Sequence, residues 1–333
     1  MIVIDKMIVH ILDPSSNVIV CSDTCMEMSD EACISMLESK MSKAFASNQR
    51  KSGHFKEGSP IQHMLEEYRA SLMGFEDMSQ KMAKYIFEAK MKCGIFEPSD
   101  LLISELVFEE RRYLVVLDNA YLQNLTHHTD QVGEHIQNEL ITYKTLLSSS
   151  LIRRDSAFMI EFSDYSVSSV EAKVVIEAQK RYFYGDVVLA CENTPSYKDA
   201  VASITKAVNQ VVEEYDLKEV EVLPKMKQII KENVEAQSDI DIEEVAQVLF
   251  EDKPQVKARF KEDVKNSGVN TPIPVENMKS SKAEKVQKIR TDKGIEIIIP
   301  VDYMNSTDYV EFLTLPDGTI SIQLKNINRI VSK

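Results

Sequence analysis

Residues 101–117 read LLISELVFEERRYLVVL, two apolar runs separated by four charged residues. Both runs have the length and the aliphatic content of β-strands, and the polar residues 109–112 suit a turn, so this stretch predicts a β-hairpin. The pattern predicts two more hairpins, 4–12 with 18–20 and 151–152 with 158–162. None of the three has a long crossover helix between its own strands, which favours an antiparallel sheet.

Helices are expected beside this sheet. Ser59-Pro60-Ile61-Gln62 combines an N-cap serine with proline at the first helical position. Apolar residues then recur every three or four positions to about Lys92, which predicts one long helix. A shorter helix is expected from Ser29 to about Phe45. The sequence therefore predicts an α+β protein whose N-terminal domain, 1–165, is an antiparallel sheet with packed helices.

The remainder predicts a helical middle region, a basic linker and a small C-terminal β unit. The middle region, 166–265, should hold helices beginning near Ser168 and Ser196, followed by two more in 213–252. Residues 266–293 contain Gly268, Pro272 and Pro274 and are predicted to be the linker. A strand at 294–300 and a hairpin turning at Leu315-Pro316-Asp317-Gly318 make up the unit 294–333.

Length and composition indicate a folded protein of the cytoplasm. A chain of 333 residues with 44% hydrophobic content can bury a substantial core. No apolar run approaches the roughly 20 residues of a membrane span, and the N-terminus lacks a signal-peptide pattern, so no membrane partner is expected. The five cysteines are an odd number and are read as reduced thiols.

Charge is distributed very unevenly along the chain. Residues 253–293 hold eleven Lys/Arg and five acids, a net charge of +6. Because the whole chain has a net charge of −14, the remaining residues carry −20. The opposite extreme is 213–252, with thirteen Asp/Glu against four Lys. Such separation concerns binding partners more than the fold.

Two basic segments are candidate phosphate contacts. The first, residues 40–56, has no acid and contains Lys40, Lys43, Arg50, Lys51 and Lys56. The second, residues 278–293, contains Lys279, Lys282, Lys285, Lys288, Arg290 and Lys293. A single run of this kind is also compatible with an ordinary solvated face. Two such runs in an acidic chain favour a polyanion held at these surfaces.

Motifs that would indicate catalysis or a cofactor are absent from the sequence. It lacks GxGxxG, GxxxxGK[ST], G-x-S-x-G and H-E-x-x-H. His127, His128 and His135 are interpreted as part of a polar helix beginning after Leu125, and the acids at 239–244 as a capped helix start, not as metal ligands. His10 is expected to be a hydrogen-bonded structural residue. We predict no catalytic residue, no metal and no cofactor.

The chain resembles bacterial nucleoid-associated proteins of the NdpA type in three places. These are Ile4-x-x-Met7-x-Val9-His10-x-Leu12, the segment with Tyr182-Phe183, Cys191 and Ser196-x-Lys198, and the run 288–297 with Pro316-Asp317-Gly318-Thr319-Ile320 and Lys325-Asn326-Ile327 beyond it. The resemblance implies a cytoplasmic, non-enzymatic protein of the nucleoid that binds duplex DNA, with topoisomerase as a candidate partner. It transfers no catalytic or base-contacting residues.

The function expected from the sequence is DNA association that is largely independent of base sequence, with geometry set by a homodimer. The dimer is expected because duplex binders commonly use two-fold symmetry. An alternative is an adaptor whose acidic helices recruit a DNA-processing enzyme such as a topoisomerase. A third interpretation is an uncharacterised nuclease using Asp239 and Asp241. Whether DNA is bent, bridged or coated stays open at this point.

Overall fold

The computed structural model describes residues 2–133, 135–269, 272–275, 278 and 280–331. Two compact units divide the chain, residues 1–194 and 195–333. The division falls later than the boundary predicted at residue 165. Helices and an antiparallel sheet occur together, which confirms the predicted α+β class. Among the described residues, no helix has both the length and the apolar character that crossing a membrane requires.

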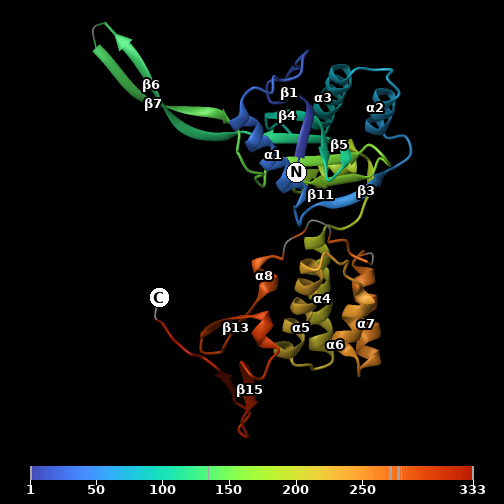
Figure 1. Cartoon of the computed structure of the whole chain (residues 1–333), viewed down its shortest axis with the longest axis vertical. Helices are drawn as coiled ribbons and strands as arrows, with labels where there is room; N and C mark the ends of the chain where they lie inside the picture. Colours follow the sequence, from blue (N-terminus) through green and yellow to red (C-terminus); the bar gives the residue numbers. More distant parts are fainter. Residues whose placement is uncertain (1, 134, 270–271, 276–277, 279, 332–333) are drawn as a thin grey trace. The chain divides into compact units, whose positions relative to one another are not determined.

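An eight-stranded sheet forms the centre of the first unit, and every neighbouring pair of strands in it is antiparallel (Figure 1). Its strands, in spatial order, are β12 (Cys191–Asn193), β3 (Lys51–Phe55), β9 (Val167–Val170), β8 (Ser156–Glu161), β5 (Arg111–Ala120), β4 (Ser99–Phe108), β1 (Ile2–Asp13) and β2 (Val18–Val20).

The predicted hairpin at 101–117 is confirmed as β4 and β5, with Phe108 opposite Arg111. The turn between them consists of Glu109 and Glu110, which have positive φ values of 48° and 66°. Two-residue hairpin turns need this left-handed backbone, because it matches the twist of the strands. Glycine or asparagine usually supplies it, so here two glutamates adopt a conformation that costs free energy.

The other two predicted hairpins had different outcomes. Pairing of β1 with β2 confirms the N-terminal hairpin. The third hairpin was wrong in one strand, since β8 pairs with β5 and β9, and residues 151–152 lie outside any strand.

Helices cover both faces of the sheet. On one face α1 (Glu31–Phe45) contributes Met41 and Phe45 to a buried cluster with the sheet. On the other, α2 (Pro60–Arg69) and α3 (Phe75–Lys92) pack on residues such as Ile103 and Val116. Strands buried on both sides read as nearly continuous apolar runs. This accounts for the sequence of β4 and β5.

Two helix predictions in this unit required correction. The helix expected from 59 to about 92 is two helices, separated at Ala70–Gly74 where Ser71 has a φ of 57°. The helix expected from 168 to 189 was wrong. That stretch forms β9, the short hairpin of β10 (Val174–Ile176) and β11 (Gln179–Arg181), and the π-helix η1 (Phe183–Val188).

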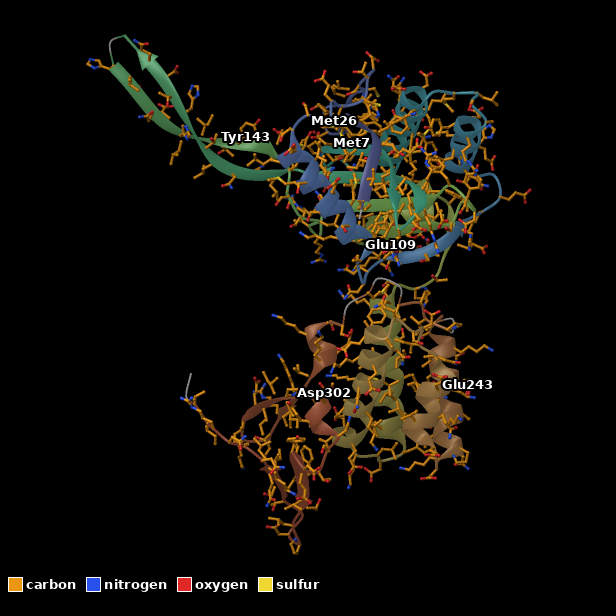
Figure 2. All side chains as sticks on the ribbon, in the orientation of Figure 1. Met7, Met26, Glu109, Tyr143, Glu243 and Asp302 are labelled. Atoms are coloured by element: carbon orange, nitrogen blue, oxygen red, sulfur yellow. The ribbon has the colours of Figure 1, made fainter. Side chains whose placement is uncertain are left out.

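A separate two-stranded ribbon replaces the helix expected after Leu125. Strands β6 (Leu122–Val132) and β7 (His135–Leu146) pair with each other and leave the sheet as a ribbon, here called the β6–β7 arm (Figure 1). His127 and His128 lie on β6, and His135 lies on β7, all three exposed. Side chains such as Tyr143 stand out from the ribbon along its length (Figure 2).

The second unit begins with a helical bundle. It contains α4 (Tyr197–Glu214), α5 (Glu219–Glu235), α6 (Ile242–Phe250) and α7 (Pro254–Asn266), whose apolar faces share one core. Ser196 caps α4 by accepting a hydrogen bond from the Asp199 N–H at 3.2 Å. Helices α4, α5 and α6 confirm the helix predicted to begin near Ser196 and the two predicted in 213–252.

Short elements follow the bundle: α8 (Lys282–Lys285), β13 (Val286–Arg290), β14 (Glu296–Pro300), α9 (Val301–Met304), β15 (Val310–Thr314) and β16 (Ile320–Leu324). The predicted strand at 294–300 and the hairpin turning at 315–318 are confirmed by β14 and by the β15–β16 pair. The linker prediction was wrong for 282–290, because α8 and β13 occupy those residues and β13 pairs with β14.

Candidate nucleic-acid interface

The basic segment begins with a capped turn of helix. Ser281 is the N-cap of α8, and its Oγ accepts a hydrogen bond from the Glu284 N–H at 3.3 Å. In return the Glu284 carboxylate accepts one from the Ser281 N–H at 2.8 Å, which completes a capping box. The cap places Lys282 and Lys285 on exposed positions of the turn while Glu284 turns inward.

Burial removes Glu284 from the solvent-facing charge of this segment. Glu284 is only 7% exposed. Burial, together with the nearby Glu284 carboxylate, raises the pKa of Tyr197. Lys227 donates a hydrogen bond to the carbonyl oxygen of Val286 at 3.1 Å, which ties β13 to α5. Glu284 is therefore turned away from the exposed lysines of this segment, and in the described part of the chain it forms no ion pair with them.

Strand alternation sorts the next residues by face. Gln287 is buried and Ile289 packs on a small apolar core, whereas Lys288 and Arg290 point to the opposite, exposed face. Register places Glu296 of β14 directly across from Arg290. One carboxylate therefore stands beside the two cations on this face, and it reduces their combined charge.

The segment presents five exposed cations against two exposed carboxylates. The cations are Lys282, Lys285, Lys288, Arg290 and Lys293, and the carboxylates are Asp292 and Glu296. Lys293 lies 3.4 Å from Asp292, an exposed pair of little energetic weight. Of the described carboxylates, none lies within ion-pair distance of the other four cations. Lys279 falls outside the described residues. We call this surface, Lys282–Glu296, the basic face.

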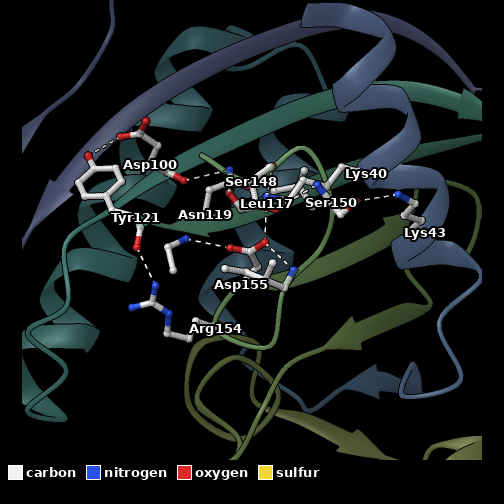
Figure 3. A network of polar contacts seen from close by, with 12 residues as sticks. Lys40, Lys43, Asp100, Leu117, Asn119, Tyr121, Ser148, Ser150, Arg154 and Asp155 are labelled. Carbon is white, nitrogen blue, oxygen red and sulfur yellow. Dashed lines mark hydrogen bonds and ion pairs between the residues drawn. The ribbon is translucent and has the colours of Figure 1, made fainter. Parts of the chain in front are cut away.

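The first predicted segment does not form a comparable surface, because its first member is buried. Lys40 on α1 is 1% exposed, and its Nζ lies 2.9 Å from Oδ2 of Asp155 (Figure 3). The Asp155 carboxylate also accepts hydrogen bonds from the N–H groups of Ile152 at 2.9 Å and Ala120 at 3.0 Å. Lys40 thus joins the helix to the loop before β8, and its ammonium is not available to a phosphate.

The other members of the first segment are scattered over several environments. Lys43 is exposed and donates a hydrogen bond to Ser150 Oγ at 2.9 Å. Lys51 is 4% exposed, with its ammonium over the ring of Tyr182. Arg50 is half-buried and Lys56 is exposed. Because Lys40 and Lys51 are buried, neither presents its ammonium group to solvent.

A cleft in the first unit brings together residues that sequence reasoning missed. It has a volume of about 1290 Å³ and lies where β4 begins and β5 ends. Lys144, Arg153, Arg154 and Lys173 are its exposed cations. Arg154 Nη2 donates a hydrogen bond to the Tyr121 carbonyl at 2.8 Å (Figure 3). The adjacent pair Arg153-Arg154, which lies between the two segments of the third predicted hairpin, is the signal in the sequence that points to this cleft.

Two buried acids, Asp118 and Glu171, also line the cleft, and each has hydrogen-bond donors beside it. Lys90 lies 2.6 Å from Asp118 Oδ2, which also accepts a hydrogen bond from the Tyr184 hydroxyl at 2.6 Å. Burial alone would raise the pKa of Asp118, but the Lys90 ammonium and neighbouring hydroxyls hold it below its ordinary value. Burial raises the pKa of Glu171, although two backbone N–H groups at 2.8 Å and the Lys51 charge oppose the shift.

The cleft as a whole carries no excess of positive charge. Five cationic side chains line it together with five acids, namely Asp13, Glu97, Asp100, Asp118 and Glu171. A phosphate chain gains affinity from net cationic charge, since each neutralised phosphate releases counterions. The basic face therefore suits a polyanion better than the cleft does.

The residues considered for a nuclease have structural partners. Asp241 caps α6 by accepting a hydrogen bond from the Glu243 N–H at 2.8 Å, and Asp239 accepts one from the Val275 N–H at 3.3 Å. The predicted capped helix start is confirmed. In the part of the chain that the structure describes, no three His, Cys, Asp or Glu side chains group as metal ligands would.

Comparison with known proteins gives a family assignment. No curated protein matches the chain. A family model described as nucleoid-associated protein YejK matches residues 8–331, which is nearly the whole chain and includes the basic face. The resemblance found in the sequence is thereby confirmed, and the chain belongs to the family of nucleoid-associated protein YejK.

Proposed function

We propose that this protein associates with duplex DNA of the nucleoid through the basic face, largely without regard to base sequence. It would act in the cytoplasm, as a homodimer and without catalysing a reaction. Membership in a nucleoid-associated family supports a role at the nucleoid. The single observation that carries the DNA contact is the burial of Glu284, which leaves five exposed cations and two exposed carboxylates within residues 282–296.

The arrangement of the cations favours backbone contact over base reading. Lys282 and Lys285 lie on a four-residue turn, and Lys288 and Arg290 lie on a strand of a short hairpin. Base-specific reading of duplex DNA generally uses a recognition element that enters the major groove. Lysine ammonium groups instead act as point charges on phosphates, which carry no sequence information.

The acidic remainder of the chain contributes to the proposal. Its net charge repels a polyanion from most of the surface, so contact is confined to the basic face. Non-specific adhesion elsewhere is weakened for the same reason. The proposal therefore predicts few phosphate contacts and a moderate dependence of affinity on salt.

Salt titration tests the proposal. If about five phosphates are engaged, log affinity for a duplex should fall against log salt concentration with a slope near −4.5. Replacing Lys282, Lys285, Lys288 and Arg290 together with alanine should flatten that slope by about 3 or more. Fluorescence anisotropy with labelled duplexes of two unrelated sequences measures both the slope and the independence of sequence.

A matched control removes the same charge elsewhere. Lys81, Lys84 and Lys92 on α3 and Lys206 on α4 are exposed and lie outside the basic segments. Their combined replacement by alanine should lower affinity uniformly and leave the slope within about 1 of the native value. Equal slopes for the two quadruple variants would remove the basic face from the DNA contact.

The acidic helices support a second candidate function, an adaptor that recruits a basic DNA-processing enzyme such as a topoisomerase. Exposed carboxylates occur along this region, including Glu219, Glu232, Glu235, Glu243 and Glu244. Two results together would favour this alternative. The protein would bind such an enzyme in a salt-dependent way, and its affinity for duplex DNA would be negligible at about 50 mM salt.

A further inference from the structure

Along the four alternate pairs from Leu125–Thr142 to Gln131–Ile136, one face of the β6–β7 arm carries no formal charge. Register pairs Leu125 with Thr142, His127 with Leu140, Thr129 with Asn138 and Gln131 with Ile136. Residues opposite each other in an antiparallel pair share a face, and alternate pairs along the ribbon share it as well. These eight residues, here called the neutral face, include no Asp, Glu, Lys or Arg.

The neutral face also holds the most exposed aliphatic side chains of the arm. Leu125 is 64% exposed, Ile136 74% and Leu140 73%. The opposite face carries the acids Asp130 and Glu139 among its described residues. The most exposed aliphatic side chains thus lie on the side of the ribbon where charge is missing, while Ile141 and Tyr143 on the opposite face are 40% and 47% exposed.

A ribbon of this kind needs a partner surface. An isolated two-stranded hairpin is at best marginally stable in water, and a third layer or strand is usually required. Among the described strands, β6 and β7 pair only with each other. All of β7 is exposed in the single chain. Within the unit of residues 1–194, no described element covers the neutral face.

We infer that the neutral face packs against the same face of a second copy of this chain. The absence of charge on the neutral face favours a second copy over DNA or a basic protein. Duplex DNA would require cations and a basic protein would require carboxylates, and the neutral face offers neither. Two copies of a chain with a net charge of −14 repel each other, and repulsion adds least where the facing surfaces are uncharged.

The spacing of the aliphatic residues suits two-fold symmetry. Leu125 and Ile136 lie at opposite ends of the four paired positions, with Leu140 between them. In an antiparallel approach of two copies, the end of one ribbon that carries Leu125 faces the end of the other that carries Ile136, and the two Leu140 side chains lie on either side of the axis. An isologous interface requires such self-complementarity. The inference rests on the homodimer in the proposed function and assigns it a surface.

The test is the oligomeric state of the full chain. Sedimentation equilibrium from about 1 to 100 μM should show a dimer. Leu140→Asp should weaken the dimer about 100-fold, because two carboxylates would be buried at the axis, one from each copy. Gln137→Asp is the matched control. It adds the same charge to the same strand on the opposite face, and should change the dissociation constant by less than about threefold.

A second variant and a second measurement distinguish loss of the interface from loss of folding. Leu125→Asp should weaken the dimer as Leu140→Asp does, and far-UV circular dichroism should show each variant folded. A native protein that stays monomeric to 100 μM, or a dimer that tolerates Leu140→Asp as well as Gln137→Asp, overturns the inference. Duplex titrations on the same samples separate the two ideas. A flat salt dependence would defeat DNA binding and leave the arm interface standing.

Discussion

The Nζ atom of Lys40 lies 2.9 Å from Oδ2 of Asp155, and both side chains are almost fully buried. Lys40 also donates a hydrogen bond to the Ser148 carbonyl at 3.3 Å. A lysine that the sequence placed in a basic segment is therefore part of the packing between α1 and the loop before β8. Burial of its partner, which lies more than a hundred residues away in sequence, decides its role.

Removal of the Lys40 charge should destabilise the fold and leave DNA binding intact. Lys40→Met leaves the Asp155 carboxylate buried without its counterion, and the free energy of unfolding should fall by about 3–5 kcal/mol. Urea denaturation at pH 7 measures this change. The exposed Lys43 provides the control, since Lys43→Met should cost less than about 0.5 kcal/mol. Equal losses would mean that the buried ion pair contributes little.

Removal of the acid opposite Arg290 should strengthen DNA binding. Glu296→Gln takes one of two exposed carboxylates from the basic face, and duplex affinity should rise about threefold near 50 mM salt. The gain should shrink as salt screens the interaction. Glu219→Gln makes the same chemical change on the acidic helix α5 and should have a smaller effect. Matching gains from both substitutions would show that only net charge matters.

Stability should depend on the protonation of His10. Its Nδ1 accepts a hydrogen bond from the Ser22 N–H at 3.1 Å, and its Nε2 lies 3.1 Å from Ser79 Oγ, so the neutral ring fits the site. This confirms the expected structural role. Burial, with a contribution from the Lys84 charge, lowers the pKa of His10 to about 4 from 6.5.

The sign of the pH effect follows from that lowered pKa. As pH falls, His10 is protonated in the unfolded chain before it is protonated in the folded one. Its contribution to the free energy of unfolding is therefore fully present above about pH 6.5, and about 2–3 kcal/mol of it is lost as the pH falls toward 4. Denaturation between pH 4 and 7 should show a flatter profile for His10→Gln. The exposed His63 offers the comparison, and a flattening of equal size in His63→Gln would contradict this account.

Loss of one hydroxyl at the floor of the cleft should be costly. Tyr184→Phe removes the donor that lies 2.6 Å from Asp118 Oδ2 and leaves a buried carboxylate with one partner fewer. The expected loss is about 1–3 kcal/mol of unfolding free energy, measured in urea at neutral pH. Tyr143→Phe on the arm removes an exposed hydroxyl and should be nearly neutral. A neutral Tyr184→Phe would show that water replaces the missing donor.

The elements with local signals were predictable from the sequence. Ser59 and Ser196 cap helices as expected, and the β4–β5 hairpin follows from two apolar runs around a polar turn. The arm was missed because its strands are polar for most of their length, so alternation of apolar residues is weak. The helix expected at 168–189 failed for a different reason. A capping-box pattern at Ser168 was outweighed by pairing of Ser168 and Ser169 with β3 and β8.

The candidate site was predictable only in part. Position along the chain identified Lys282, Lys285, Lys288 and Arg290 as a cluster, and strand alternation keeps the last two on one face. Burial could not be read from the sequence. Lys40 and Lys51 pack against segments far away in the chain, and Glu284 turns inward through its own cap. Long-range packing therefore determines which charges reach solvent.

The turn at Glu109 and Glu110 offers a site at which the stability of the fold can be increased. Both residues hold a backbone conformation, with φ of 48° and 66°, that branched and bulky side chains resist. Changing Glu109→Asn together with Glu110→Gly supplies the pair that this turn type prefers, and should raise the melting temperature by a few degrees, corresponding to about 1 kcal/mol. Differential scanning calorimetry would register the gain. Because this hairpin lies at the centre of the sheet, such a variant is a sound parent for crystallisation and for the substitutions above.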